Sequence, residues 1–165
     1  MRKTEWADIE AVHDRAARGA KAVIDASEEE LSPIIAVHRM GKPGEIVDAF
    51  LMPPDLARSL FGSVAGKDRM VALVKQALAS AVECGVVTVV AVVCEAWTVR
   101  NPLVIDRSIP PSEHPDRVEA LLITLYSMLG THLSSTPIKT VDGKRTVDLP
   151  VLLKGHRAEG PMVLR

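Results

Sequence analysis

Residues 86–94 form the most apolar run of the chain, and they constrain its fold more than any other segment. Eight of these nine residues are Val, Ala or Cys. β-Branched residues favour strands, and a strand that is apolar at every position needs cover on both faces. The pattern alternates beyond Cys94, so we predict a strand over residues 86–98. The apolar run is too short to cross a bilayer as a helix.

Two long segments have apolar residues three and four positions apart, which is typical of amphipathic helices. The first covers residues 4–27 and carries an alanine-rich stripe. The second covers residues 68–84, where Asp68 is expected to cap the start and Gly85 to follow the end. A short helix over Pro54–Phe61 is also predicted, because proline is favoured in the first turn of a helix.

Turn signals divide most of the remaining chain into strands. The Gly-Lys-Pro-Gly turn at 41–44 separates two strands expected at 33–40 and 45–52. The Asp-Gly pair at 142–143 is a strong hairpin turn. Residues 117–127 fit the spacing of both a helix and a strand, and we interpret them as a strand because Ile, Thr and Tyr occur in this short run.

These elements predict one α+β domain over residues 1–165. We expect a mixed or mainly antiparallel sheet of about five to six strands, with two main helices packed on one face. The apolar run at 162–164 would add a strand at one edge. The open edges of such a sheet are surfaces on which another chain can pair.

Composition excludes several classes of protein. Twenty Lys and Arg nearly cancel 21 Asp and Glu, so the chain lacks the basic excess typical of proteins that bind nucleic acid. Cys84 and Cys94 are too few for a four-cysteine zinc site and are expected as buried, reduced thiols. No apolar segment follows the N-terminus, which predicts a cytoplasmic protein with no membrane segment.

The motifs of common enzymes are absent, and no cofactor is evident. Residues 62–67 have three residues between their glycines where a P-loop needs four, and Asp68 stands where Ser or Thr should bind magnesium. The chain also lacks Gly-x-Gly-x-x-Gly, His-Glu-x-x-His, an EF-hand loop and Pro-Cys-x-x-Cys.

Four polar residues flank a proline-rich loop at 101–115 and form the main candidate site. They are Glu95, His114, Asp116 and Glu119. If the flanking strands pair antiparallel, Trp97 lies opposite Glu119, with Glu95 on the same face. The cleft could then hold a divalent metal or perform acid–base catalysis, with Glu95 and Asp116 as ligands and His114 as a ligand or base.

The same residues also have a structural interpretation, which is the more common role for such residues. Glu95 would pair with Arg117 or Arg100, and Asp116 would cap the loop. The loop could instead bind a partner. The run Glu-Ala-Trp, the proline-rich loop and the following His-Pro-Asp-Arg resemble small bacterial or phage proteins, and this resemblance implies no activity.

Two other histidines are expected to have structural roles. His13 lies on the apolar stripe of the first helix, where a partly buried, hydrogen-bonded side chain is more common than a ligand. His38 could reach Asp48 across the first hairpin and form a structural hydrogen bond.

The sequence therefore predicts a non-enzymatic protein that works by association, as a homodimer or other homo-oligomer or as an accessory factor for a protein partner. An enzyme is not excluded: the alternative is a metal-dependent hydrolase or nuclease that uses the candidate cleft. A third alternative is nucleic-acid contact through basic residues near the C-terminus. These residues are Lys139, Lys144, Arg145, Lys154 and Arg157.

Overall fold

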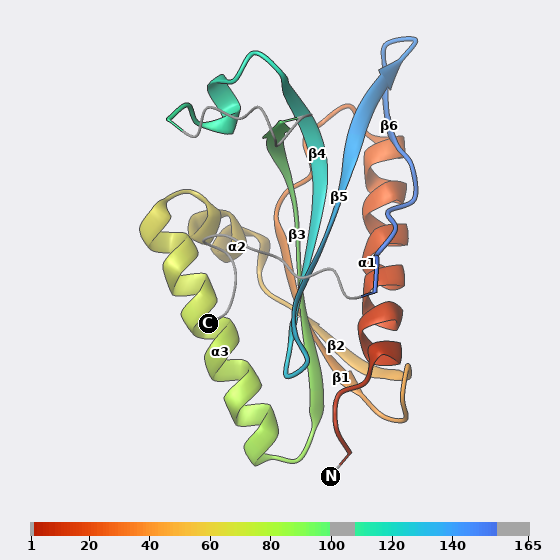
Figure 1. The fold of residues 1–165 in the computed structure, drawn as a ribbon, viewed down its shortest axis with the longest axis vertical. Helices are drawn as coiled ribbons and strands as arrows, with labels where there is room; N and C mark the ends of the chain where they lie inside the picture. Colours follow the sequence, from red (N-terminus) through yellow and green to blue (C-terminus); the bar gives the residue numbers. More distant parts are fainter. Residues whose placement is uncertain (1, 100–107, 155–165) are drawn as a thin grey trace.

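The computed structural model describes residues 2–99 and 108–154. The elements are α1 (Trp6–Ala26), β1 (Ile34–Met40), β2 (Ile46–Leu51), α2 (Pro54–Phe61), α3 (Val64–Glu83), β3 (Val87–Val99), the short 3-10 helix η2 (Pro111–Glu113), β4 (Arg117–Ser127), β5 (Gly130–Val141) and β6 (Lys144–Val147). The strands form one sheet in the order β2-β1-β3-β4-β5-β6, with antiparallel neighbours (Figure 1). The predicted α+β fold with a mainly antiparallel sheet is confirmed.

The ambiguous segment 117–127 is a strand, as predicted, because it pairs with β3 on one side and β5 on the other. Trp97 lies opposite Glu119 in this pairing, also as predicted. The turn at Asp142 and Gly143 joins β5 to β6, with φ values of 52° and 77°. Such positive angles are what a two-residue hairpin of type I′ requires. The strand expected at 162–164 lies outside the described residues.

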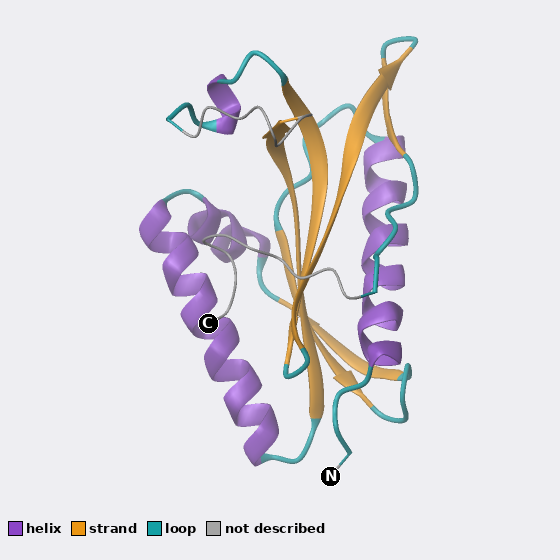
Figure 2. Cartoon of the chain, in the orientation of Figure 1, coloured by secondary structure: helices purple, strands orange, loops and turns teal. Residues whose placement is uncertain are grey.

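The two long helices lie on opposite faces of the sheet, so the expectation that they share one face is wrong (Figures 1 and 2). Successive side chains of a strand point to opposite faces. On β3, Val89 and Ala91 pack in the core under α1, whereas Val90 and Val92 pack in the core under α2 and α3. A run that is apolar at every position therefore fills two cores. None of the described helices combines the length and apolar character needed to cross a membrane.

Helix α3 begins at Val64, before the predicted start at Asp68. The Ser63 hydroxyl caps it and accepts a hydrogen bond of 2.9 Å from the Gly66 N–H. Ser63 thus bonds one of the free N–H groups at the start of the helix. Asp68 lies inside the helix, beyond its first turn, so it cannot cap this end. A Cβ at Gly66 would lie 2.5 Å from the Leu60 carbonyl oxygen, so only glycine allows α2 and α3 to meet this closely.

Helix α1 is fixed at its start by the buried side chain of Asp8. Arg2 donates two hydrogen bonds of 2.8 Å to this carboxylate, and the N–H groups of Glu5 and Gly44 donate at 2.8 and 3.0 Å. Burial alone would raise the pKa of Asp8, but these donors outweigh it and hold the pKa below its ordinary value. Because Gly44 lies in the β1–β2 turn, Asp8 ties the first hairpin to α1.

Candidate functional site

Glu95 and Glu119, two of the four candidate cleft residues, share one cation. The Arg145 Nη2 lies 2.7 Å from Oε1 of Glu95 and 3.8 Å from Oε2 of Glu119. Arg145 also donates a hydrogen bond of 2.9 Å to the Glu29 carbonyl. The Glu95 side chain is only 5% exposed, so loss of Arg145 would leave a buried, unpaired charge. This arrangement fits a structural ion pair.

The partner of Glu95 is not the one predicted. Arg117 instead lies over the ring of Trp97, 5.1 Å from the ring centroid, so the expected pairing with Arg117 is wrong. Arg100, the other expected partner, lies outside the described residues. Arg145 lies on β6, which packs against α1. Its side chain lies on the α1 face of the sheet, and there it reaches Glu95.

His114 and Asp116 contact each other in the turn before β4. The Asp116 N–H donates a hydrogen bond of 3.1 Å to Nδ1 of the buried His114, and the Asp116 side chain is exposed. The four candidates therefore form two separate pairs: Glu95 lies with Glu119, and His114 lies with Asp116. Within residues 2–99 and 108–154, no three His, Cys, Asp or Glu side chains are placed to hold a metal ion. The metal-dependent hydrolase stays a prediction.

His13 of α1 and His38 of β1 differ in their bonding. His13 is buried, as expected, with Nε2 2.7 Å from the Ser134 hydroxyl, and burial lowers its pKa. His38 does not reach Asp48, because their side chains point to opposite faces and Asp48 pairs with Arg39 at 2.9 Å. Nδ1 of His38 has no hydrogen-bond partner in the described part of the chain.

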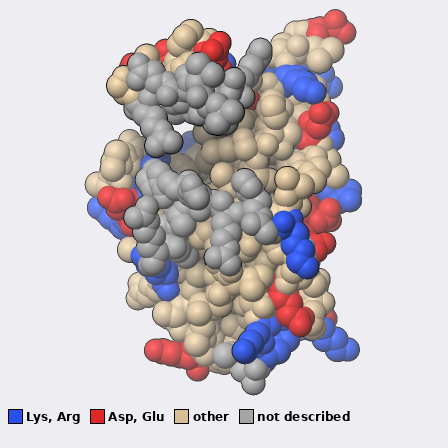
Figure 3. Space-filling model, in the orientation of Figure 1, with Lys and Arg blue, Asp and Glu red and all other residues tan. Residues whose placement is uncertain are grey.

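The basic residues near the C-terminus are partly taken up by internal contacts. Arg145 pairs with Glu95, and the Lys139 Nζ lies 3.1 Å from Asp148. Lys144 and Lys154 are exposed, whereas Arg157 lies outside the described residues. On the face shown in Figure 3, basic and acidic side chains are interspersed along the sides of the molecule. The prediction of nucleic-acid contact gains no support from this pattern.

The two thiols have different surroundings. Cys94 is half-buried, and burial raises its pKa to about 11, so the thiol is protonated at neutral pH. Cys84 is exposed at the end of α3, so the expectation that both cysteines are buried is wrong. Cys94 lines a hollow of about 520 Å³ together with Arg58, Lys67 and Thr124.

Strand β2 (Ile46–Leu51), here called the β2 edge, exposes apolar side chains at one border of the sheet. The exposed fractions are 50% for Val47, 56% for Phe50 and 71% for Leu51. The Met52 N–H donates to the Ile35 carbonyl at 2.9 Å, which fixes the direction of the alternating backbone groups. The N–H and C=O groups of Ala49 and Leu51 therefore point away from β1. Within residues 2–99 and 108–154, these groups have no partner.

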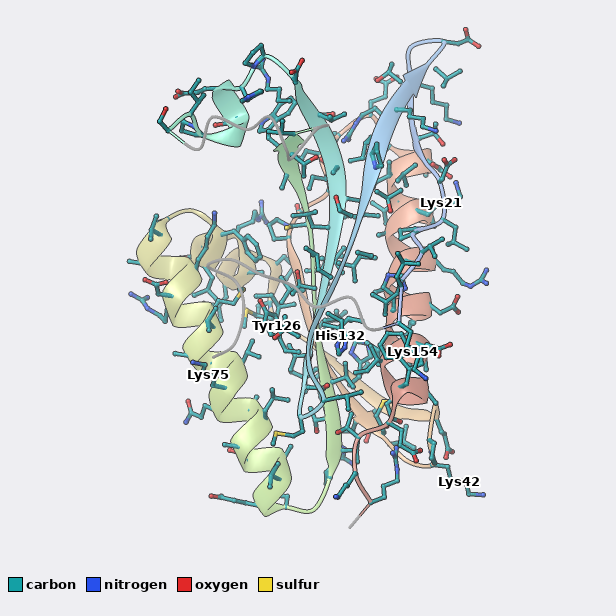
Figure 4. All side chains as sticks on the ribbon, viewed as in Figure 1. Lys21, Lys42, Lys75, Tyr126, His132 and Lys154 are labelled. Atoms are coloured by element: carbon teal, nitrogen blue, oxygen red, sulfur yellow. The ribbon has the colours of Figure 1, made fainter. Side chains whose placement is uncertain are left out.

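At the opposite border, β6, side chains of α1 bond the outward backbone of Val147. Because β5 and β6 join through a two-residue turn, the backbone of Val147 points away from β5. Its N–H donates to Oδ1 of Asp25 at 3.3 Å, and its carbonyl accepts from Nζ of Lys21 at 2.7 Å (Figure 4). The Thr146 hydroxyl also donates to Asp25, at 2.9 Å. The outward groups of Val147 are thus satisfied within the chain.

The β2 edge is the candidate functional site, because it combines free backbone groups with exposed apolar side chains. Sequence reasoning anticipated open sheet edges but did not identify which one was open. No protein-family model, curated protein or solved structure matches this chain.

Proposed function

We propose that this protein works by association, as a homodimer in which the β2 edges of two copies pair antiparallel. One observation carries the proposal: within residues 2–99 and 108–154 the outward backbone groups of Ala49 and Leu51 have no partner, and exposed apolar side chains flank them. A free edge is a ready template for another strand, and monomeric proteins usually protect such edges with lysine, proline or a covering element.

The β2 edge is complementary to itself. Side chains at alternate positions share a face, so Ala49 and Leu51 lie on one side of the strand. A two-fold axis at Phe50 would pair Ala49 with Leu51 of the second copy, and Leu51 with Ala49, within the regular part of the strand. The outward backbone groups would then meet as hydrogen-bonded pairs, and apolar side chains would lie beside apolar side chains. The β1–β2 pairing passes from Arg39–Asp48 to Met40–Ile46, so Val47 is the bulged residue and the strand is regular over residues 48–51.

The charges on β2 also favour a second copy. Asp48 is the charged residue of the β2 edge, and it is bonded to Arg39 of its own chain at 2.9 Å. Two paired edges would therefore not oppose uncompensated carboxylates, which would be destabilising across neighbouring strands.

Sedimentation equilibrium over micromolar to submillimolar concentrations tests the proposal. We expect the wild-type chain to show the mass of a dimer and Phe50→Lys to shift it to a monomer. Val141→Lys is the matched control, because Val141 lies near the β6 border and is 55% exposed, compared with 56% for Phe50. A wild-type chain that stays monomeric, or equal dissociation of both variants, would show that the β2 edge is not a dimer interface.

A further inference from the structure

A cavity of about 260 Å³ lies between α1 and the strands β1 and β2. Small residues make up much of its wall: Ala16, Gly19 and Ala20 of α1 and Ala36, Ala49 and Ala91 of the strands. Because the side chains are small on both the helix and the sheet, they do not fill the space between the two surfaces. The space opens to solvent, because Arg15, Gly19 and Leu51 on its wall are exposed, so a small molecule can enter it from solution.

His38 adds a polar atom to this apolar wall. The residue is only 4% exposed, lines the cavity, and has no hydrogen-bond partner for Nδ1 among the described residues. A buried polar atom without a partner costs about 1–3 kcal/mol, so such atoms are rare in native proteins. Burial lowers the pKa of His38, against the opposing effect of the Val89 and Ala36 carbonyls. A neutral ring keeps one N–H to donate.

Arg15 supplies a cation at the same cavity. Its side chain is exposed, lines the cavity and forms no ion pair within the described residues. Arg18, on the same helix, is by contrast paired with Asp14 at 3.0 Å. Arg15 and His38 line the same cavity. A guanidinium binds carboxylates with two parallel hydrogen bonds, so the cavity offers a place for one acidic head group.

We propose that this cavity binds a small aliphatic carboxylate, whose head group contacts Arg15 and His38 and whose chain fills the alanine-lined space. An apolar cavity of about 150 Å³ can hold benzene. The cavity of about 260 Å³ would by the same measure hold roughly ten non-hydrogen atoms, which is the size of octanoate. The apolar wall disfavours sugars and nucleotides, which carry many polar groups.

Calorimetric titration with octanoate tests this site. We expect one saturable site per chain, with an affinity at least about tenfold weaker in Arg15→Gln and in His38→Phe. Octylammonium should not bind, because its charge is repelled by Arg15, and octan-1-ol should bind less tightly than octanoate. Equal binding of octylammonium, or no saturable binding at millimolar octanoate, would overturn the proposal. So would a marked loss of thermal stability in His38→Phe, since the imidazole would then have a structural role.

Two variants of Gly19 show whether the cavity is the site. A Cβ built at Gly19 meets nothing within 4 Å, so Gly19→Ala should fold and bind octanoate with nearly wild-type affinity. Gly19→Leu should fill the cavity and abolish binding; unchanged affinity in this variant would place the ligand elsewhere. The Phe50→Lys variant separates this inference from the proposed dimer, because Phe50 does not line the cavity.

Discussion

The two borders of the sheet both lie near α1, yet among the described residues the helix bonds outward backbone groups of β6 and none of β2. At β6, Asp25 and Lys21 bond the N–H and C=O of Val147. At β2, the helix reaches only the turn, where Asp8 bonds Gly44, and the outward groups of the strand stay free of partners among the described residues. Proximity of a helix is therefore not enough to close an edge; its side chains must bond the strand itself.

The same difference continues beneath α1. On the β5 side, His13 is bonded to Ser134, whereas on the β1 side His38 has an unpartnered Nδ1 and lines a cavity. Among the described residues, the β2 edge and the cavity that His38 lines thus lie on the same side of the molecule. We infer that binding takes place on this side, whereas the β6 side serves stability.

Replacement of Asp8 should cause the largest loss of stability, because it removes the hydrogen bonds that hold the β1–β2 turn against α1. Asp8→Ala deletes the acceptor of four hydrogen bonds, so we expect the free energy of unfolding to fall by about 3 kcal/mol in urea denaturation. Asp14→Ala, which breaks an exposed pair on the same helix, should cost less than about 0.5 kcal/mol. Equal losses would show that Asp8 does not fix the helix.

Proline at position 49 tests whether the outward N–H of β2 is used in a dimer. Ala49→Pro removes an N–H that points away from β1, so the fold should persist while dimerisation weakens about 30-fold, or about 2 kcal/mol. Phe50→Pro is the matched variant, because its N–H points toward β1, and it should lower the melting temperature instead. Sedimentation and thermal melting separate these outcomes. A wild-type dimer in Ala49→Pro would place the interface elsewhere.

Asp25→Ala should open the closed border at a smaller cost. The variant frees the Val147 N–H and the Thr146 hydroxyl, which water can then reach, so we expect a loss of about 1 kcal/mol in urea denaturation. Asp25→Asn keeps one acceptor oxygen and should recover part of this loss. A larger loss of stability than in Asp8→Ala would show that the hydrogen bonds of Asp25 contribute more than those of Asp8.

Acidification should give the most gradual effect. Burial holds the pKa values of His13 and His38 below the ordinary value of 6.5, so the unfolded chain takes up protons before the folded chain does. Stability is therefore complete above this value and falls as the pH drops below it. Thermal melts across this range should show the decline, and combining His13→Gln with His38→Phe should flatten it. An unchanged decline in the double variant would assign the pH dependence to other groups.

Sequence patterns predicted those elements whose structure depends on interactions within a few residues. The apolar run gave β3, and the Asp142–Gly143 pair gave the last hairpin, because side-chain branching and positive φ angles act within a few residues. The start of α3 was less clear, since the Ser63 cap works together with a close approach at Gly66 that only the folded chain reveals.

Contacts between distant segments could not be predicted in the same way. Glu95 follows an apolar run and needs a cation, but its partner Arg145 lies 50 residues away on a strand that folds back beside α1. The helices were expected on one face even though an all-apolar β3 requires two covers. The cavity at His38 depends on how closely α1 approaches the sheet, which no spacing in the sequence records.

Strand β3 has a further consequence for the motion of the sheet. Its first seven residues are buried, and none of its last six is. Its pairing with β1 ends at Val93, so beyond this residue β4 is its only partner strand among the described residues. Amide hydrogens before Val93 should exchange with solvent only when the whole domain unfolds, whereas those near Thr98 should exchange through local opening. The end of the β3–β4 ribbon can thus bend as a two-stranded arm while the two cores stay closed.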